Sequence, residues 1–165
     1  MNKRHKERLM KLADTLRGVP TKLFDLDSIT YIPIDYSNSE YTNPSYTTDW
    51  DKYKKDQNKI FQALVKKEPD CGATACAIGW CPATFPRTFE WDKFGDVTLK
   101  SNNDLGAFEA AQEFFGLTEE QSQYLFMPDA YHESKRGPKS VASRIEAFVK
   151  RDGVLSKQFL ETYNF

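Results

Sequence analysis

Hydrophobic residues near the start of the chain recur with the spacing of one helix face. They are Leu9, Leu12, Ala13 and Leu16. Positions i, i+3, i+4 and i+7 lie on the same side of an α-helix, so this spacing predicts an amphipathic helix over Lys3–Arg17. Gly18 and Pro20 follow directly, and both residue types are typical of the end of a helix.

Later segments carry a helical pattern between recognisable end signals. We expect further helices from Thr47 or Thr48 to Lys67, from Asp104 to Phe115, from Thr118 to Phe126 and from Pro138 towards Gly153. The apolar face expected on the first of these consists of Trp50, Tyr53, Gln57, Ile60, Phe61, Leu64 and Val65. Gly116 ends one helix, and the residues from Thr118 to Gln121 form a capping box that opens the next. Pro138 suits the first position of the last long helix.

Two other segments have a different pattern. Thr88–Trp91 and Val97–Lys100 flank a short polar stretch containing Gly95, which predicts a β-hairpin. Asp70–Trp80 is dominated by Ala, Gly, Cys and Thr, and we expect a short, mostly buried helix there, ended by Cys81 and Pro82.

Together these elements predict a mainly α fold. We expect a single globular domain over residues 1–165, with five or six helices and one small β-hairpin. Hydrophobic residues make up 39% of the chain and charged residues 28%, which is typical of a globular domain rather than a disordered one. Residues 37–48 are rich in Ser, Thr, Asn and Tyr, so we expect a loop insertion at 35–49.

The charges of the chain nearly cancel. Lys and Arg number 23 against 24 Asp and Glu, which gives a net charge of −1. Such a total provides no overall attraction to nucleic acid or to anionic lipid. The charges are clustered, however, because residues 1–11 and 134–157 are mainly basic and residues 101–133 are acidic. Nucleic-acid binding through the two basic segments therefore remains only a second alternative.

Three cysteines are present, and no apolar stretch resembles a signal peptide or a membrane span. An odd number of thiols without such a signal favours a reducing compartment, so we expect a cytoplasmic protein with no membrane association. Cys71, Cys76 and Cys81 lie five residues apart, and five residues turn a helix by about 140°, which disfavours shared metal ligation. No glycine-rich phosphate-binding motif occurs, and we expect no metal and no cofactor.

Cys71 and His132 are the weak candidates for catalysis. Cys71 lies at the start of the helix predicted over Asp70–Trp80, where the helix dipole lowers the pKa of a thiol, and a histidine could activate it. The alternative is that Cys71 is a small buried side chain, and we favour that interpretation because free cysteines are usually buried. An enzyme is therefore the less favoured interpretation.

Two loops supply the candidate binding residues. They are Tyr36, Tyr41 and Tyr46 in the insertion, and Asp129, Tyr131 and His132 after Pro128. Tyrosines in a polar loop are typical of adaptable binding surfaces, because each ring offers rigid amphipathic contact area. Loop composition alone explains both sets equally well.

Three segments resemble a family of small uncharacterised proteins encoded by bacteriophages and bacteria. They are Cys71–Trp80, with its Cys-Gly-x-x-Ala-Cys-x-x-Gly-Trp pattern, Ala110–Thr118 and Val141–Ile145. The opening helix with Phe24–Leu26 fits the same family, and the resemblance covers most of residues 5–150 but not 35–49. The resemblance implies no activity. It does imply a phage or bacterial accessory protein that works in the cytoplasm of the bacterial host cell.

The leading hypothesis is a non-enzymatic interaction protein, a phage accessory protein that binds and modulates a host defence or regulatory factor. The first alternative is a small-ligand-binding protein or an enzyme that uses Cys71 and the loop over Asp129–Glu133. The sequence does not identify the partner or the oligomeric state.

Overall fold

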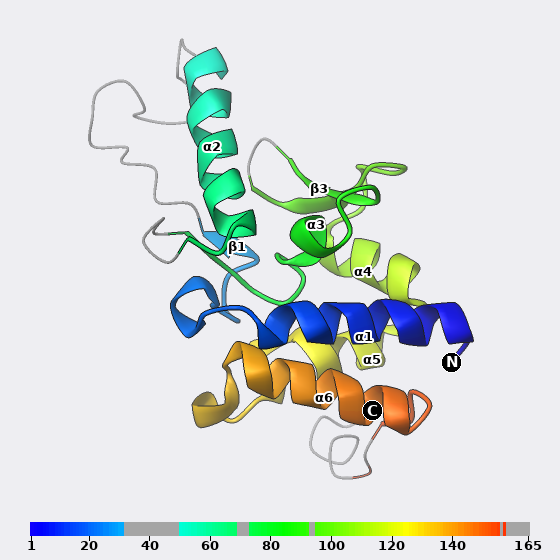
Figure 1. The fold of residues 1–165 in the computed structure, drawn as a ribbon. Helices are drawn as coiled ribbons and strands as arrows, with labels where there is room; N and C mark the ends of the chain where they lie inside the picture. Colours follow the sequence, from blue (N-terminus) through cyan, green and yellow to red (C-terminus); the bar gives the residue numbers. More distant parts are fainter. Residues whose placement is uncertain (32–49, 69–72, 93–94, 156, 158–165) are drawn as a thin grey trace.

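The computed structural model describes residues 1–31, 50–68, 73–92, 95–155 and 157, with the backbone alone for 50–54. This part of the chain forms a mainly α domain, as predicted, with six α-helices and two small antiparallel sheets (Figure 1). The helices are α1 (Lys3–Arg17), α2 (Trp50–Val65), α3 (Cys81–Thr84), α4 (Ala107–Phe115), α5 (Glu119–Phe126) and α6 (Pro138–Lys150). The strands are β1 (Thr30–Tyr31), β2 (Thr74–Ala75), β3 (Phe89–Trp91) and β4 (Val97–Leu99). Short 3₁₀ turns cover Thr21–Leu23, Pro128–Ala130 and Glu133–Lys135.

Helix α1 packs against α6, α4 and α3 (Figure 1). We call α1, α4, α5 and α6 together the helical body. Both ends of the helix predicted over Lys3–Arg17 are confirmed, and the side chain of Asn2 caps it by accepting from the backbone N–H of His5 at 2.8 Å. Its four predicted apolar residues are fully buried. They pack in one core with the buried face of α6, which consists of Val141, Ala142, Ile145 and Phe148.

The turn between α4 and α5 follows the predicted signals closely. Gly116 has a φ of 63°, in the left-handed region that favours glycine. The imidazole of His5 also lies against it, and a Cβ at this position would be 2.0 Å from His5 Cε1. Thr118 and Gln121 form both hydrogen bonds of the capping box.

Basic residues of α1 find partners inside the fold. The guanidinium of Arg8 lies 3.8 Å from the ring centroid of Phe114 and donates a hydrogen bond to the Phe114 carbonyl near the end of α4. Arg17 donates to both carboxylate oxygens of Glu146 on α6, at 2.7 and 2.6 Å, and this hydrogen bonding lowers the pKa of Glu146. Arg8 and Arg17 therefore hold α1 to α4 and α6.

The helix predicted over Asp70–Trp80 is wrong for residues 73–80, the part of it that the structure describes. Thr74–Ala75 is instead the strand β2, which pairs with β1 in a second sheet that the sequence did not predict. Gly79 then packs directly on the backbone, because a Cβ there would be 1.9 Å from the Ile29 carbonyl oxygen. The small residues of this segment allow close backbone approach, and the Cys81–Pro82 pair begins α3 rather than ending a helix.

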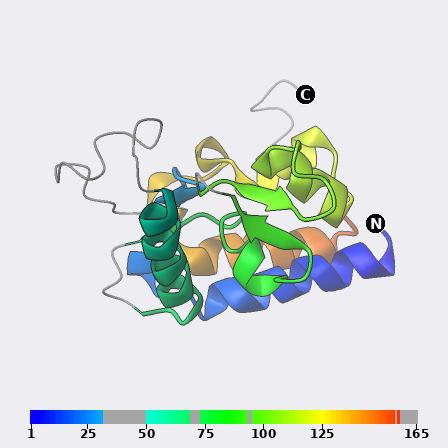
Figure 2. The same ribbon diagram turned by 90° about the horizontal axis from the view of Figure 1, so that it is seen from above.

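Helix α2 stands at the edge of the molecule and runs across the direction of α1 and α6 (Figures 1 and 2). The β3–β4 hairpin next to it forms as predicted, with Gly95 at a φ of 90°. The side chains of Gln57, Phe61 and Leu64 are buried, but Val65, expected on the same apolar face, is 45% exposed. The apolar face of α2 is therefore only partly covered by the described residues.

Candidate functional site

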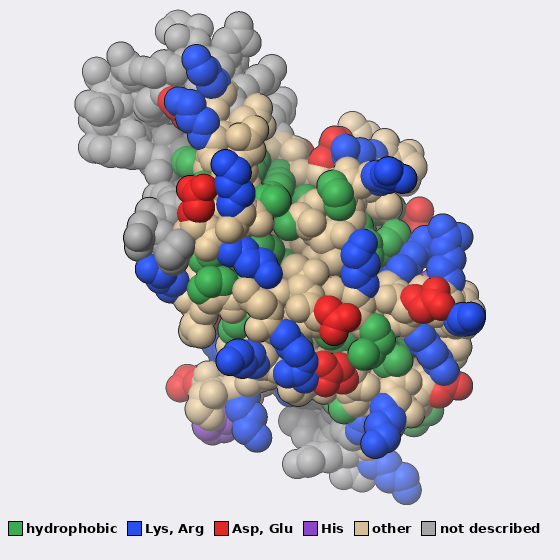
Figure 3. All heavy atoms as spheres, viewed as in Figure 1, with side chains coloured by type: hydrophobic (Ala, Val, Ile, Leu, Met, Phe, Trp, Pro, Cys, Tyr) green, Lys and Arg blue, Asp and Glu red, His purple; other side chains and the backbone are tan. Residues whose placement is uncertain are grey.

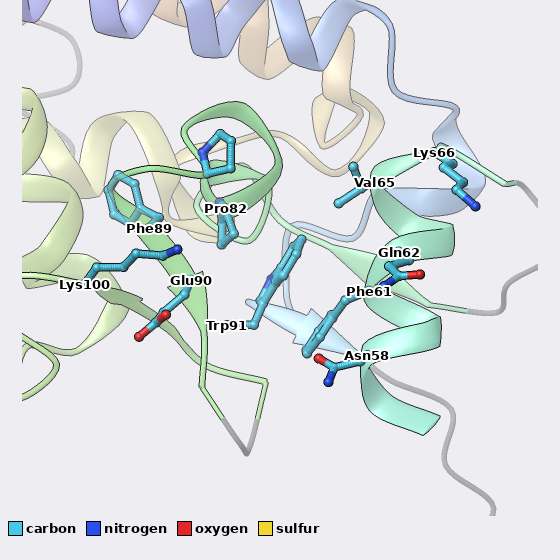
Figure 4. Close-up of a pocket in the computed structure, with 11 residues that line it drawn as sticks. Asn58, Phe61, Gln62, Val65, Lys66, Pro82, Phe89, Glu90, Trp91 and Lys100 are labelled. Atoms are coloured by element: carbon cyan, nitrogen blue, oxygen red, sulfur yellow. The ribbon is translucent and has the colours of Figure 1, made fainter. Parts of the chain in front are cut away.

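A recess of about 480 Å³ lies between α2 and the hairpin (Figure 4). It is lined by Asn58, Phe61, Gln62 and Val65 of α2, by Lys66 directly after α2, by Pro82, Pro86, Phe89, Glu90 and Trp91, and by Lys100 after β4. We call it the α2–β3 recess. Its volume falls within the range of roughly 300–1,000 Å³ that is usual for ligand sites.

One wall of the α2–β3 recess is a single face of α2. Asn58, Phe61, Gln62 and Val65 are spaced at i, i+3, i+4 and i+7, so helical geometry turns them to the same side. The two amides can each donate and accept hydrogen bonds, whereas Phe61 and Val65 offer apolar surface. This wall therefore combines an apolar centre with polar groups.

The other wall comes from α3 and β3. The ring of Trp91 stacks on Phe61 with the ring centroids 4.5 Å apart and the planes 6° from parallel. This contact joins the hairpin to α2, and Figure 4 shows the two rings facing each other. Among the described residues the indole N–H of Trp91 is buried without a hydrogen-bond partner. The rigid rings give the recess a stable apolar floor, because paired aromatics stabilise each other beyond their burial.

Charged side chains stand at the rim. Lys66, Lys100 and Glu90 are all exposed. The ammonium of Lys66 lies 3.9 Å from Glu68, at the outer limit of an ion pair, and Lys100 has no ion pair within the described ranges. On the face seen in Figure 3, hydrophobic side chains lie between Lys and Arg side chains on both sides. The rim is thus more positive than negative.

The structure does not test whether the predicted catalytic residues lie together. Cys71 lies outside the described residues. His132 is exposed, caps the turn Glu133–Lys135 by accepting from the Ser134 backbone, and its Nδ1 lies 2.9 Å from the Ser134 hydroxyl. Cys76 and Cys81 are buried, and burial raises the pKa of the Cys76 thiol to about 11 and that of Cys81 well above its usual value. These two thiols are therefore packing groups rather than nucleophiles.

The predicted binding residues after Pro128 are tied to the helical body. Tyr131 is buried, donates its hydroxyl proton to the Leu125 carbonyl at 2.6 Å, and lies under the guanidinium of Arg144 at 3.4 Å from its ring centroid. Burial raises the pKa of Tyr131. Asp129 is exposed and lies 3.8 Å from Arg136. Neither they nor His132 line the α2–β3 recess, and Tyr36, Tyr41 and Tyr46 lie outside the described residues.

Sequence reasoning missed the α2–β3 recess. Its α2 wall reads as an ordinary amphipathic helix, and its other wall was predicted only as a hairpin. The usable signal was the length of the apolar face on α2. This face continues to Val65, beyond Phe61 and Leu64, which the core buries. Locating the recess needs the position of the hairpin relative to α2, which depends on the Phe61–Trp91 contact over a long sequence separation.

Comparisons of the chain with protein-family models, with curated proteins and with solved structures find no match. No helix in the described ranges is long and apolar enough to cross a membrane. Within the same ranges, no three His, Cys, Asp or Glu side chains cluster in a way that could hold a metal ion.

Proposed function

We propose that the protein is a non-enzymatic interaction protein that binds another protein through the α2–β3 recess. The observation that supports this proposal is a surface recess with an aromatic floor, amide groups on one wall and charges at the rim. Protein interfaces commonly have this arrangement, in which a buried apolar or aromatic centre is surrounded by a polar rim.

The exposure of the lining favours a protein partner over a small molecule. Small-molecule sites usually enclose about 70–90% of their ligand. Here Asn58, Gln62, Pro86 and the three charged rim residues are exposed, and Val65 is 45% exposed. A small ligand remains the second candidate because the volume of the recess suits one.

We further propose a host protein as the partner and the cytoplasm of a bacterial host cell as the location. The resemblance of the Cys71–Trp80, Ala110–Thr118 and Val141–Ile145 segments to small phage and bacterial proteins supports this part of the proposal. Such accessory proteins often work by binding a component of the host.

Native mass spectrometry of the protein recovered from the cells that make it tests the proposed function. We expect a complex with a second polypeptide at fixed stoichiometry. Val65→Asn should abolish it, because the substitution places an amide in the apolar centre of the recess. Val154→Asn is the matched control, since Val154 is 64% exposed and does not line the recess.

Three results would contradict the proposal. One is the absence of any bound polypeptide. Another is a polypeptide that stays bound to the Val65→Asn variant, since binding would then use a different surface. The third is a bound small molecule that is lost with Val65→Asn, which would favour the second candidate.

A further inference from the structure

The α2–β3 recess follows the edge of β3 with which no other described strand pairs. In an antiparallel pair, alternate residues direct their backbone N–H and C=O groups towards the partner strand. Lys100 N–H donates to the Thr88 carbonyl and Asp92 N–H donates to the Asp96 carbonyl, so Thr88, Glu90 and Asp92 face β4. It follows that Phe89 and Trp91 direct their backbone groups away from β4.

The hydrogen bonds of β3 agree with this alternation. Phe89 N–H donates at 3.0 Å to Phe85 rather than to β4. The carbonyl of Phe89 and both backbone groups of Trp91 have no backbone partner outside the β3–β4 ladder among the described residues. Such an edge can pair with the backbone of another chain.

The lining residues place the recess along this edge. Side chains of consecutive strand residues point to opposite faces of a sheet, yet Phe89, Glu90 and Trp91 all line the same recess. Figure 4 shows Trp91 directed towards Phe61 of α2, with Glu90 and Lys100 farther from α2. A recess that reaches both faces must pass an edge of β3, and β4 already occupies the other edge.

We propose that the α2–β3 recess binds an extended acidic peptide segment of a partner protein, which adds as a third strand beside β3. The proposal rests on the proposed function and specifies the chemistry of the partner. Backbone hydrogen bonds to Phe89 and Trp91 supply the pairing, and a bulky apolar side chain packs against Phe61 and Val65 between the hairpin and α2. Acidic side chains of the peptide meet Lys66 and Lys100.

Charge and edge together favour a peptide over a single-stranded nucleic acid. Nucleic-acid grooves combine aromatic platforms with cations that follow a phosphate at every nucleotide. The lining of the recess carries only two cations with Glu90 beside them, and one face of each aromatic ring is used in the Phe61–Trp91 stack. Open backbone donors and acceptors on β3 suit another polypeptide.

Selection from a display library of random linear peptides tests this inference on the full chain. We expect the enriched peptides to share a bulky apolar residue flanked by Asp or Glu. Their affinities are then measured by fluorescence anisotropy, at low and at physiological salt, with oligo-dT as the nucleic-acid probe. We expect weaker peptide binding at higher salt, because screening reduces attraction between exposed charges.

Two double variants of equal charge change separate the rim from the overall charge. Lys66→Glu with Lys100→Glu should weaken binding by roughly tenfold or more, since charge reversal at an interface rim opposes association. The control, Lys135→Glu with Lys139→Glu, alters exposed lysines that do not line the recess and should leave binding within about twofold, because only the small overall field changes.

The outcomes separate this inference from the proposed function. Enriched peptides that lose binding with Val65→Asn but show no acidic preference would overturn the inference and keep the recess as a protein-binding site. Peptides that bind the Val65→Asn variant unchanged would contradict both. If oligo-dT binds and competes with the peptides for the recess, the ligand is a nucleic acid, and the inference of a peptide is overturned.

Discussion

One face of α1 and one face of α2 have the same residue spacing, but the face of α1 is buried and the face of α2 is partly exposed. On α1, the apolar residues at i, i+3, i+4 and i+7 are all fully buried against neighbouring helices. On α2, the corresponding set from Asn58 to Val65 mixes amides with apolar residues and lines an open recess. The difference lies in the neighbours: α1 is covered by α3, α4 and α6, whereas α2 touches the hairpin through the Phe61–Trp91 stack.

The basic side chains of α1 and those at the recess differ in a similar way. Arg8 of α1 donates to a carbonyl near the end of α4, and Arg17 pairs with the Glu146 carboxylate on α6 at the surface. Lys66, directly after α2, and Lys100, on the other side of the recess, remain exposed at its rim. A closed face and contacts between helices stabilise the helical body, while the partly open face of α2 with its exposed charges is the surface that we propose binds a partner.

The largest expected effect is a loss of stability in the helical body. Leu12→Ala should lower the free energy of unfolding by about 2–5 kcal/mol, because a fully buried leucine leaves a cavity in a packed core. Val65→Ala on α2 should change it by less than about 0.5 kcal/mol, as expected for an exposed site. Urea unfolding followed by circular dichroism measures both, and equal losses would contradict the division between the two regions.

A smaller effect is expected at the loop after α5. Tyr131→Phe removes the hydrogen bond to Leu125 and leaves a buried carbonyl without its partner, which should cost about 1–3 kcal/mol. The affinity of recess-selected peptides should not change. Lost peptide binding with unchanged stability would instead favour the loop with Asp129 and His132 as the binding surface.

Local sequence signals predicted the elements of the helical body well. Gly18, Gly116, Thr118 and Pro138 each act through the backbone of adjacent residues, so the sequence alone indicates where α1 and α4 end and where α5 and α6 begin. The prediction of a helix over Asp70–Trp80 failed because Ala, Gly and Cys fit both a buried helix and a closely packed strand followed by a turn. The pairing of β2 with β1, from a distant segment, decided between the two.

The recess could not be predicted from local signals either, because it also depends on a contact between segments that are distant in sequence. Its existence depends on how far the hairpin stands from α2, and that distance is determined by Phe61 and Trp91 from two separate elements. The binding candidates chosen from sequence were loop residues, and one of them, Tyr131, is buried and donates its hydroxyl proton to the Leu125 carbonyl.

The smallest expected effect is a pH dependence from His5. Partial burial, followed by the nearby charges of Arg8 and Arg4, lowers the pKa of His5 below its usual 6.5. The unfolded chain therefore binds the proton more readily, and stability should fall as the pH drops below about 6.5 towards the lowered folded value.

Thermal unfolding between about pH 7.5 and about pH 5.5 measures this dependence. His5→Gln should reduce the slope, whereas His132→Gln, at an exposed imidazole, is the control that should keep it. A slope unchanged by His5→Gln would contradict the partial burial of His5 against Gly116.

Amide hydrogen exchange at β3, measured by NMR, tests the open strand edge most directly. The Trp91 amide should exchange quickly in the isolated protein, because it points away from β4, while the Glu90 amide should be protected by its ladder bond. Adding a recess-selected peptide should slow exchange at Trp91 and leave Glu90 unchanged. A Trp91 amide that is already protected in the isolated protein, or that stays fast with peptide bound, would contradict the account.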